Sequence, residues 1–114
     1  WLPLGEDNLA RAVDRQDGDP ASLLNLTREL IALRSDSPAL RQGACTVLHA
    51  DAQALVLRRD HAGQVIDCVF NLSGQACPWP SATVAGRTIA AVNGAASGTE
   101  LPPFGAVMIE GIPL

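Results

Sequence analysis

Residues 19–38 read DPASLLNLTRELIALRSDSP. This stretch contains one predicted helix and the proline before which that helix ends. Asp19 suits the N-cap, and Pro20 suits the first helical position. Six apolar residues then recur at helical spacing and form one stripe: Leu23, Leu24, Leu26, Leu30, Ile31 and Leu33. Arg34 falls in the last turn, and Ser37 ends the helix because it precedes a proline. The pattern therefore predicts one amphipathic helix that ends before Pro38.

The sequence after Pro38 predicts strands and turns only. Its short apolar runs are residues 46–48, 54–59, 65–71, 83–84, 88–92 and 106–110. Residues 65–71 are apolar on both faces, which predicts a central strand. Residues 60–64 read as a turn in which Gly63 takes a positive φ. Short strands with regular turn signals predict two antiparallel sheets that pack as a β-sandwich of the Greek-key type.

Composition narrows the class of protein. The chain has 114 residues and a net charge of −4, so nucleic acid and anionic membranes are not expected as partners. No apolar run reaches the length of a membrane span. The length suffices for one small core and is too short for a (β/α)₈ barrel. The chain begins with Trp1 inside an apolar run rather than with Met, which favours a fragment of a longer protein.

The three cysteines are expected to be free thiols. Their odd number rules out a complete disulfide framework, and Cys68 reads as a small buried residue of its strand. A bridge between Cys68 and Cys77 is the alternative, but thiols in reducing compartments stay unpaired. No CxxC motif or His at zinc spacing is present, so neither a metal nor a cofactor is expected. No triad arrangement surrounds His49 or His61, so no catalytic role is expected for them.

An ordered set of residues resembles one known family. The set runs Trp1-Leu2-Pro3-Leu4, Asn8, Gln16, Asp19-Pro20, Ser22-Leu23-Leu24, Arg28, Leu30-Ile31, Leu33-Arg34, Pro38-Ala39-Leu40, Gly43, Asn71-Leu72-Ser73 and Leu101-Pro102-Pro103-Phe104-Gly105. It resembles the C-terminal stretch of α-glucosidases in the α-amylase superfamily, in the oligo-1,6-glucosidase branch of glycoside hydrolase family 13. The resemblance is dense over residues 1–43 and nearly absent over residues 75–99. Phe104 stands where the family has Tyr.

The resemblance implies a domain boundary and a parent enzyme. Residues 1–37 would be the last loop and helix of a catalytic (β/α)₈ barrel, and residues 38–114 the C-terminal β-sandwich domain. The expected fold class is therefore mainly β, preceded by one helix from the end of the barrel. The parent would be a bacterial, cytoplasmic enzyme that hydrolyses α-glucosidic bonds in oligosaccharides or disaccharides with net retention. Its Asp nucleophile and Glu acid/base lie upstream, so the expected partners are the barrel of the same protein and its α-glucoside substrate.

Two tryptophans are the candidates for sugar contact in this chain. By the resemblance, Trp1 would lie on the active-site side of the loop after the last barrel strand, and it is the candidate for contact with the substrate of the parent enzyme. Trp79, between Pro78 and Pro80, could offer a stacking platform, so a free-standing carbohydrate-binding sandwich is an alternative. An interaction module without sugar contact is another. The 12 acidic residues are expected on the surface or at caps, with Asp67 facing outward from its strand.

Overall fold

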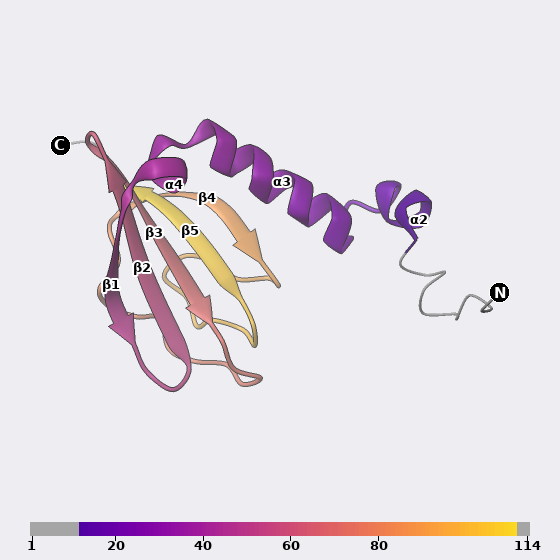
Figure 1. Cartoon of the computed structure of the whole chain (residues 1–114). Helices are drawn as coiled ribbons and strands as arrows, with labels where there is room; N and C mark the ends of the chain where they lie inside the picture. Colours follow the sequence, from indigo (N-terminus) through magenta and orange to yellow (C-terminus); the bar gives the residue numbers. More distant parts are fainter. Residues whose placement is uncertain (1–11, 112–114) are drawn as a thin grey trace. The chain divides into compact units, whose positions relative to one another are not determined.

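The computed structural model describes residues 12–111, which fall into two compact units. Within the described residues, the helical unit comprises residues 12–36 and the sheet unit comprises residues 37–111 (Figure 1). Residues 1–11 and 112–114 lie outside the described part, so the prediction for Trp1 falls outside it too.

The helical unit contains α2 (Val13–Asp17) and α3 (Leu23–Asp36). We did not predict α2, because five residues carry too little apolar periodicity. The assignment of Asp19 as the N-cap of α3 is wrong. Its carboxylate accepts a hydrogen bond from the Ala21 N–H at 2.9 Å, which holds a turn ahead of the helix. Ser22 is the cap, since its Oγ accepts from the Asn25 N–H at 3.2 Å.

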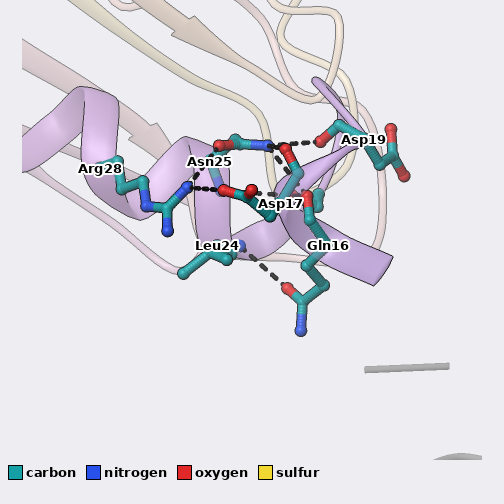
Figure 2. A network of polar contacts seen from close by, with 7 residues as sticks. Gln16, Asp17, Asp19, Leu24, Asn25 and Arg28 are labelled. Atoms are coloured by element: carbon teal, nitrogen blue, oxygen red, sulfur yellow. Dashed lines mark hydrogen bonds and ion pairs between the residues drawn. The ribbon is translucent and has the colours of Figure 1, made fainter. Parts of the chain in front are cut away.

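Polar contacts join α2 to α3, as Figure 2 shows. The side-chain nitrogen of Asn25 donates to the carbonyls of Gln16 at 2.9 Å, Asp17 at 3.2 Å and Asp19 at 2.8 Å. Gln16 Oε1 accepts from the Leu24 N–H at 3.0 Å, which satisfies a further free donor at the start of α3. Since α3 has no buried residue, hydrogen bonds rather than apolar packing hold this junction.

The sheet unit contains one antiparallel sheet with the strand order β1-β2-β3-β5-β4 (Figure 1). The strands are β1 (Ala44–Ala50), β2 (Ala54–His61), β3 (Gln64–Asn71), β4 (Gly86–Val92) and β5 (Ala106–Gly111). The central place of β3 confirms the prediction for residues 65–71. The β2–β3 turn is also confirmed, with φ values of 50° at Ala62 and 90° at Gly63. The fold is mainly antiparallel β, as predicted.

Two predictions for the residues after Ser37 are wrong. Residues Pro38–Gln42 form a short helix, α4, with proline in its first turn, where its missing N–H removes no helical hydrogen bond. Residues 83–84 form no strand. The reason is that the Val84 N–H donates to Asp67 Oδ2 at 2.6 Å and so is taken by a side chain rather than by a neighbouring strand.

The core of the sheet unit lies between one face of the sheet and the loops 72–85 and 93–105. Its buried members are Ala54, Val56, Val69, Cys77, Ala95, Leu101, Val107 and Ile109. Cys77 and Leu101 form an isolated antiparallel bridge, with N–H···O distances of 3.0 and 2.9 Å. In the described residues, loops that carry this bridge form the second layer of the sandwich, in place of the second sheet that the sequence predicts.

Asn71 links two of the sheet-unit segments that carry the family resemblance, residues 71–73 and 101–105. Its Nδ2 donates to the carbonyls of Gln75 at 2.7 Å, Pro102 at 3.0 Å and Leu101 at 3.3 Å. Its backbone N–H donates to the Gly105 carbonyl at 2.8 Å. Residues 71–73 lie beside residues 101–105 as a result.

Candidate functional site

Trp79 borders a pocket of about 250 Å³ whose polar lining includes His49, Asp51 and Gln53. The indole is half-buried and packs against the core. Its Nε1–H donates to Thr83 Oγ1 at 3.2 Å. Trp79 is therefore held in place by packing and a hydrogen bond rather than standing free as a flat platform. The pocket has room for a small polar ligand, with the aromatic ring on one side.

His49 and Asp51 form a pair at this pocket that we did not predict. His49 Nε2 lies 2.7 Å from Asp51 Oδ2. Asp51 Oδ1 accepts from the N–H groups of Gln53 and Ala54, both at 2.7 Å. The Ala54 and Gln53 donors, followed by His49, lower the pKa of Asp51 to about 2. The carboxylate is thus ionised at neutral pH and closes the β1–β2 turn.

Asp67 is fully buried, so the prediction that it faces outward is wrong. Arg58, its partner across β2 and β3, donates from Nε to Oδ1 at 2.8 Å and from Nη2 to Oδ2 at 2.9 Å. The Val84 N–H adds a third donor. The carboxylate raises the pKa of Arg58 in turn. With three donors on its two oxygens, Asp67 is a structural anchor between the sheet and the loop before β4.

A second pocket, of about 600 Å³, lies between α4 and the β2–β3 turn, with Gln42, His61, Gln64 and Glu110 in its lining. Gln64 Oε1 accepts from the Ala39 N–H at 2.9 Å and so fixes α4 to the sheet. Within residues 12–111, no group of three or more His, Cys, Asp or Glu side chains could hold a metal ion. None of the described helices is long and apolar enough to cross a membrane.

Cys45, Cys68 and Cys77 are all free. Cys77 and Val69 belong to the core. Because successive side chains of a strand point to opposite faces, Cys68 lies on the face of β3 opposite to that of Val69. The two sulfur atoms therefore sit on opposite sides of the sheet, which rules out the alternative bridge. Burial raises the pKa of the Cys68 thiol to about 11, so it is no nucleophile at neutral pH.

The chain is similar to proteins that act on α-glucosides. No family model matches it. A probable α-glucosidase of Rhizobium meliloti (strain 1021) is 37% identical over 76 residues, which are 67% of this chain and 14% of that protein. The solved structure of the α-glucosyl transfer enzyme XgtA is 33% identical, with a TM-score of 0.75, over 98% of this chain and 22% of that one.

Solved structures at lower identity share the fold. An isomaltulose synthase variant from Erwinia rhapontici NX5 is 20% identical with a TM-score of 0.84, over 99% of this chain and 22% of that one. The trehalulose synthase MutB from Pseudomonas mesoacidophila MX-45 is 22% identical with a TM-score of 0.80, over 96% and 21%. The chain thus spans 14% to 22% of the length of these relatives. Together with the ordered residues in segments 1–43, 71–73 and 101–105, these matches place the chain in the α-amylase family, as the C-terminal part of a larger enzyme.

Proposed function

We propose that this chain is the non-catalytic C-terminal part of a retaining α-glucosidase that hydrolyses α-glucosidic bonds in oligosaccharides or disaccharides. The 37% identity to a probable α-glucosidase supports the activity. In this proposal residues 1–37 complete a catalytic (β/α)₈ barrel, with Trp1 on its active-site side, and residues 38–114 form the domain after the barrel. The free thiols favour a reducing, cytoplasmic location.

Four acidic side chains that are already bonded within the chain support the proposal that the catalytic carboxyl groups lie elsewhere. A retaining glycosidase needs two carboxyl groups about 5 Å apart on either side of the scissile bond, with one able to attack and one able to give a proton. Three acidic residues of the described part are held in ion pairs, namely Asp17 with Arg28, Asp67 with Arg58 and Glu110 with Arg87, and Asp51 is hydrogen-bonded to His49. The buried one, Asp67, already uses both oxygens.

An activity comparison tests this proposal. The 114-residue chain and a polypeptide that carries the catalytic domain ahead of it are assayed on p-nitrophenyl α-glucoside. We expect turnover from the longer polypeptide only. Turnover by the 114-residue chain that survives repurification and is lost in the Asp51→Asn or Asp67→Asn variant would contradict the proposal. Analysis of the products from maltose and from sucrose separates hydrolysis, which yields monosaccharides only, from glucosyl transfer, which yields new glucosides.

A second candidate function is sugar binding at the pocket beside Trp79. The combination of an indole with the polar groups of Asp51 and Gln53 favours it, because sugars bind by stacking and by planar hydrogen-bonding groups. Electrophoresis of the 114-residue chain through gels containing glucose polymers tests it. Retardation that disappears in the Trp79→Ala variant would support binding, and equal mobility with and without polymer would refute it.

A further inference from the structure

The pocket beside Trp79 lies at the end of the sheet where β1 and β3 finish and where β2 and β5 begin. The last row of paired residues at this end consists of Ala50, Leu55, Phe70 and Ala106. Three segments continue from this row: the turn 51–53, residues 72–75 and residues 102–105. We call these three segments the rim. The pocket includes residues of the turn 51–53, so it is one part of a longer surface.

Hydrogen bonds join the three segments of the rim. The Leu72 N–H donates to the Gln53 carbonyl at 2.7 Å, and the Phe104 N–H donates to the Ser73 carbonyl at 3.1 Å. Gln53 Nε2 also lies 3.4 Å from Ser73 Oγ. Because β2 and β3 separate β1 from β5, the rim is about 14 Å long at about 4.8 Å between strands. This length exceeds one sugar ring and suits a short chain of linked rings.

Phe104 stands at the end of the rim far from Trp79, and its backbone is strained. Its φ is 53°, in the left-handed region that bulky residues rarely adopt. The side chain is still 59% exposed, so burial of the ring does not offset the strain. The conformation is held because Asn93 Nδ2 donates to the Phe104 carbonyl at 2.8 Å, and the Gly105 N–H donates to the Pro102 carbonyl at 2.9 Å. Strain that the surroundings maintain in this way is common where a protein binds a ligand.

The two aromatic side chains at the ends of the rim are fixed in place. Pro78 and Pro80 restrict the backbone on either side of Trp79. At the other end, Gly74 leaves the ring of Phe104 uncovered, since a Cβ there would lie 3.8 Å from its Cε2. Rigid aromatic rings bind a ligand with little loss of side-chain entropy. Both ends of the rim therefore offer an apolar surface on which a sugar ring can stack.

The charge of the rim indicates a neutral ligand. None of its three segments contains Lys or Arg, and Asp51 is ionised because its pKa is about 2. An anionic ligand would be repelled by this carboxylate. The segments also carry the side-chain amides of Gln53 and Gln75, which are planar groups able to bond sugar hydroxyls. Aromatic rings at both ends with carboxylate and amide groups between them are the composition of a site for a neutral oligosaccharide.

We propose that the rim binds an α-linked gluco-oligosaccharide, with one sugar ring in the pocket beside Trp79 and a later ring of the same molecule stacked on Phe104. This inference deepens the second candidate function and rests on it, and the choice of glucose units follows from the proposed activity. It adds Phe104 as a sugar-binding residue, and it adds a preference for oligosaccharides over disaccharides.

Calorimetric titration of the 114-residue chain with maltohexaose and with maltose tests the inference. We expect maltohexaose to bind at least about tenfold more tightly than maltose, which corresponds to about 1.4 kcal/mol. Phe104→Ala should remove this difference, and Phe104→Tyr should keep it because the ring remains. Leu72→Ala is the matched control, since Leu72 is an apolar residue of the rim that is 62% exposed but has no ring. It should leave both affinities unchanged.

A second pair of variants tests the strain at position 104. Phe104→Gly and Phe104→Ala both remove the ring, but only glycine adopts a positive φ without cost. Phe104→Gly should therefore unfold at a higher temperature than Phe104→Ala, while neither variant distinguishes maltohexaose from maltose. A higher unfolding temperature for Phe104→Ala would show that position 104 stores no strain and would count against the inference.

Two results would overturn the inference while the second candidate function stands. One is equal affinity for maltose and maltohexaose that is lost in Trp79→Ala, which would confine binding to the pocket. The other is a preference for maltohexaose that survives in Phe104→Ala. Binding of neither probe would refute the inference and the second candidate function together. Turnover of p-nitrophenyl α-glucoside by the longer polypeptide is measured separately, so the proposed activity is judged independently of all these results.

Discussion

The helical unit and the sheet unit each contain an Arg–Asp pair, and the two pairs differ in their surroundings. In the helical unit, Arg28 and Asp17 pair with side chains 52% and 60% exposed. In the sheet unit, Arg58 pairs with an Asp67 that water does not reach. The same contrast holds for apolar residues, since α3 buries none while the sheet unit has a continuous core. The sheet unit thus contains what it needs to fold, and the helical unit is held mainly by local polar contacts.

Hydrogen exchange should show the largest difference between the units. The amides of residues 65–70 exchange only on global unfolding, because β3 is the central strand. For a domain of ordinary stability, about 5 kcal/mol or more, this slows exchange by about 10³-fold or more. Leu23 is 73% exposed and Ile31 is 61% exposed, so the amides of residues 23–33 should exchange through local fraying. Equal protection of both segments in a demonstrated monomer would contradict the difference in stability between the two units.

Removing the charge of each aspartate should sharpen the same contrast in free energy. Asp67→Asn leaves Arg58 beside a neutral amide and should destabilise the sheet unit by about 3 kcal/mol, the lower end for a buried pair, because the Arg58 side chain is 32% exposed. Asp17→Asn should cost about 1 kcal/mol or less, as exposed pairs do. Urea unfolding of both variants measures the difference.

A double variant checks the reason for the cost of Asp67→Asn. If it arises from an unpaired buried group, Arg58→Met combined with Asp67→Leu should recover part of the lost stability, since apolar residues replace a buried pair well. A double variant no more stable than Asp67→Asn would point instead to the lost bond from the Val84 N–H.

The sequence sufficed for the antiparallel β fold because its signals are local. The apolar run of residues 65–70 and the turn at Gly63 are each determined within a few residues. Where two nearby residues suit the same structural role, the choice between them was harder to predict. Asp19 and Ser22 are both good N-caps, and the choice depends on a turn in which Asp19 already bonds the Ala21 N–H. Likewise, Pro38 lies between the end of α3 at Asp36 and the rest of α4, so a proline marks a boundary without determining whether a strand or a helix comes next.

The buried polar contacts of the sheet unit were beyond sequence reasoning. Asp67 in an apolar strand reads as outward-facing, unless one knows that Arg58 is directly opposite it in β2. That register depends on the β2–β3 turn, and the third donor comes from Val84, 17 residues further along. The pair of His49 and Asp51 did have a signal, because residues two apart at a strand end share a side. The chemistry of the parent came from the family resemblance rather than from any residue here.

The cap of α3 gives a smaller effect, confined to the helical unit. Ser22→Ala removes the acceptor of the Asn25 N–H and the hydroxyl that donates to the Gln16 carbonyl at 2.7 Å. We expect a loss of about 1 kcal/mol of helix stability, seen as faster amide exchange over residues 24–26. Ser35→Ala is the matched control, since Ser35 is exposed in the last turn of the same helix. Equal effects of the two substitutions would remove Ser22 from the role of cap.

The smallest effect should appear only at low pH, through Asp51. Its pKa is about 2 in the folded chain, against an ordinary value of 3.8. A carboxyl group whose pKa is lowered by folding stabilises the fold above its unfolded pKa and loses that contribution as the pH falls through the folded value. The unfolding temperature of the sheet unit should therefore contain a part that declines between about pH 4 and pH 2 and is missing in Asp51→Asn. Asp36→Asn, at the exposed end of α3, should leave that decline in place. Because Asp51 is itself exposed, the decline is small. If the unfolding temperature of Asp51→Asn ran parallel to that of the unsubstituted chain from pH 6 to pH 2, the turn between β1 and β2 would not depend on the charge of Asp51.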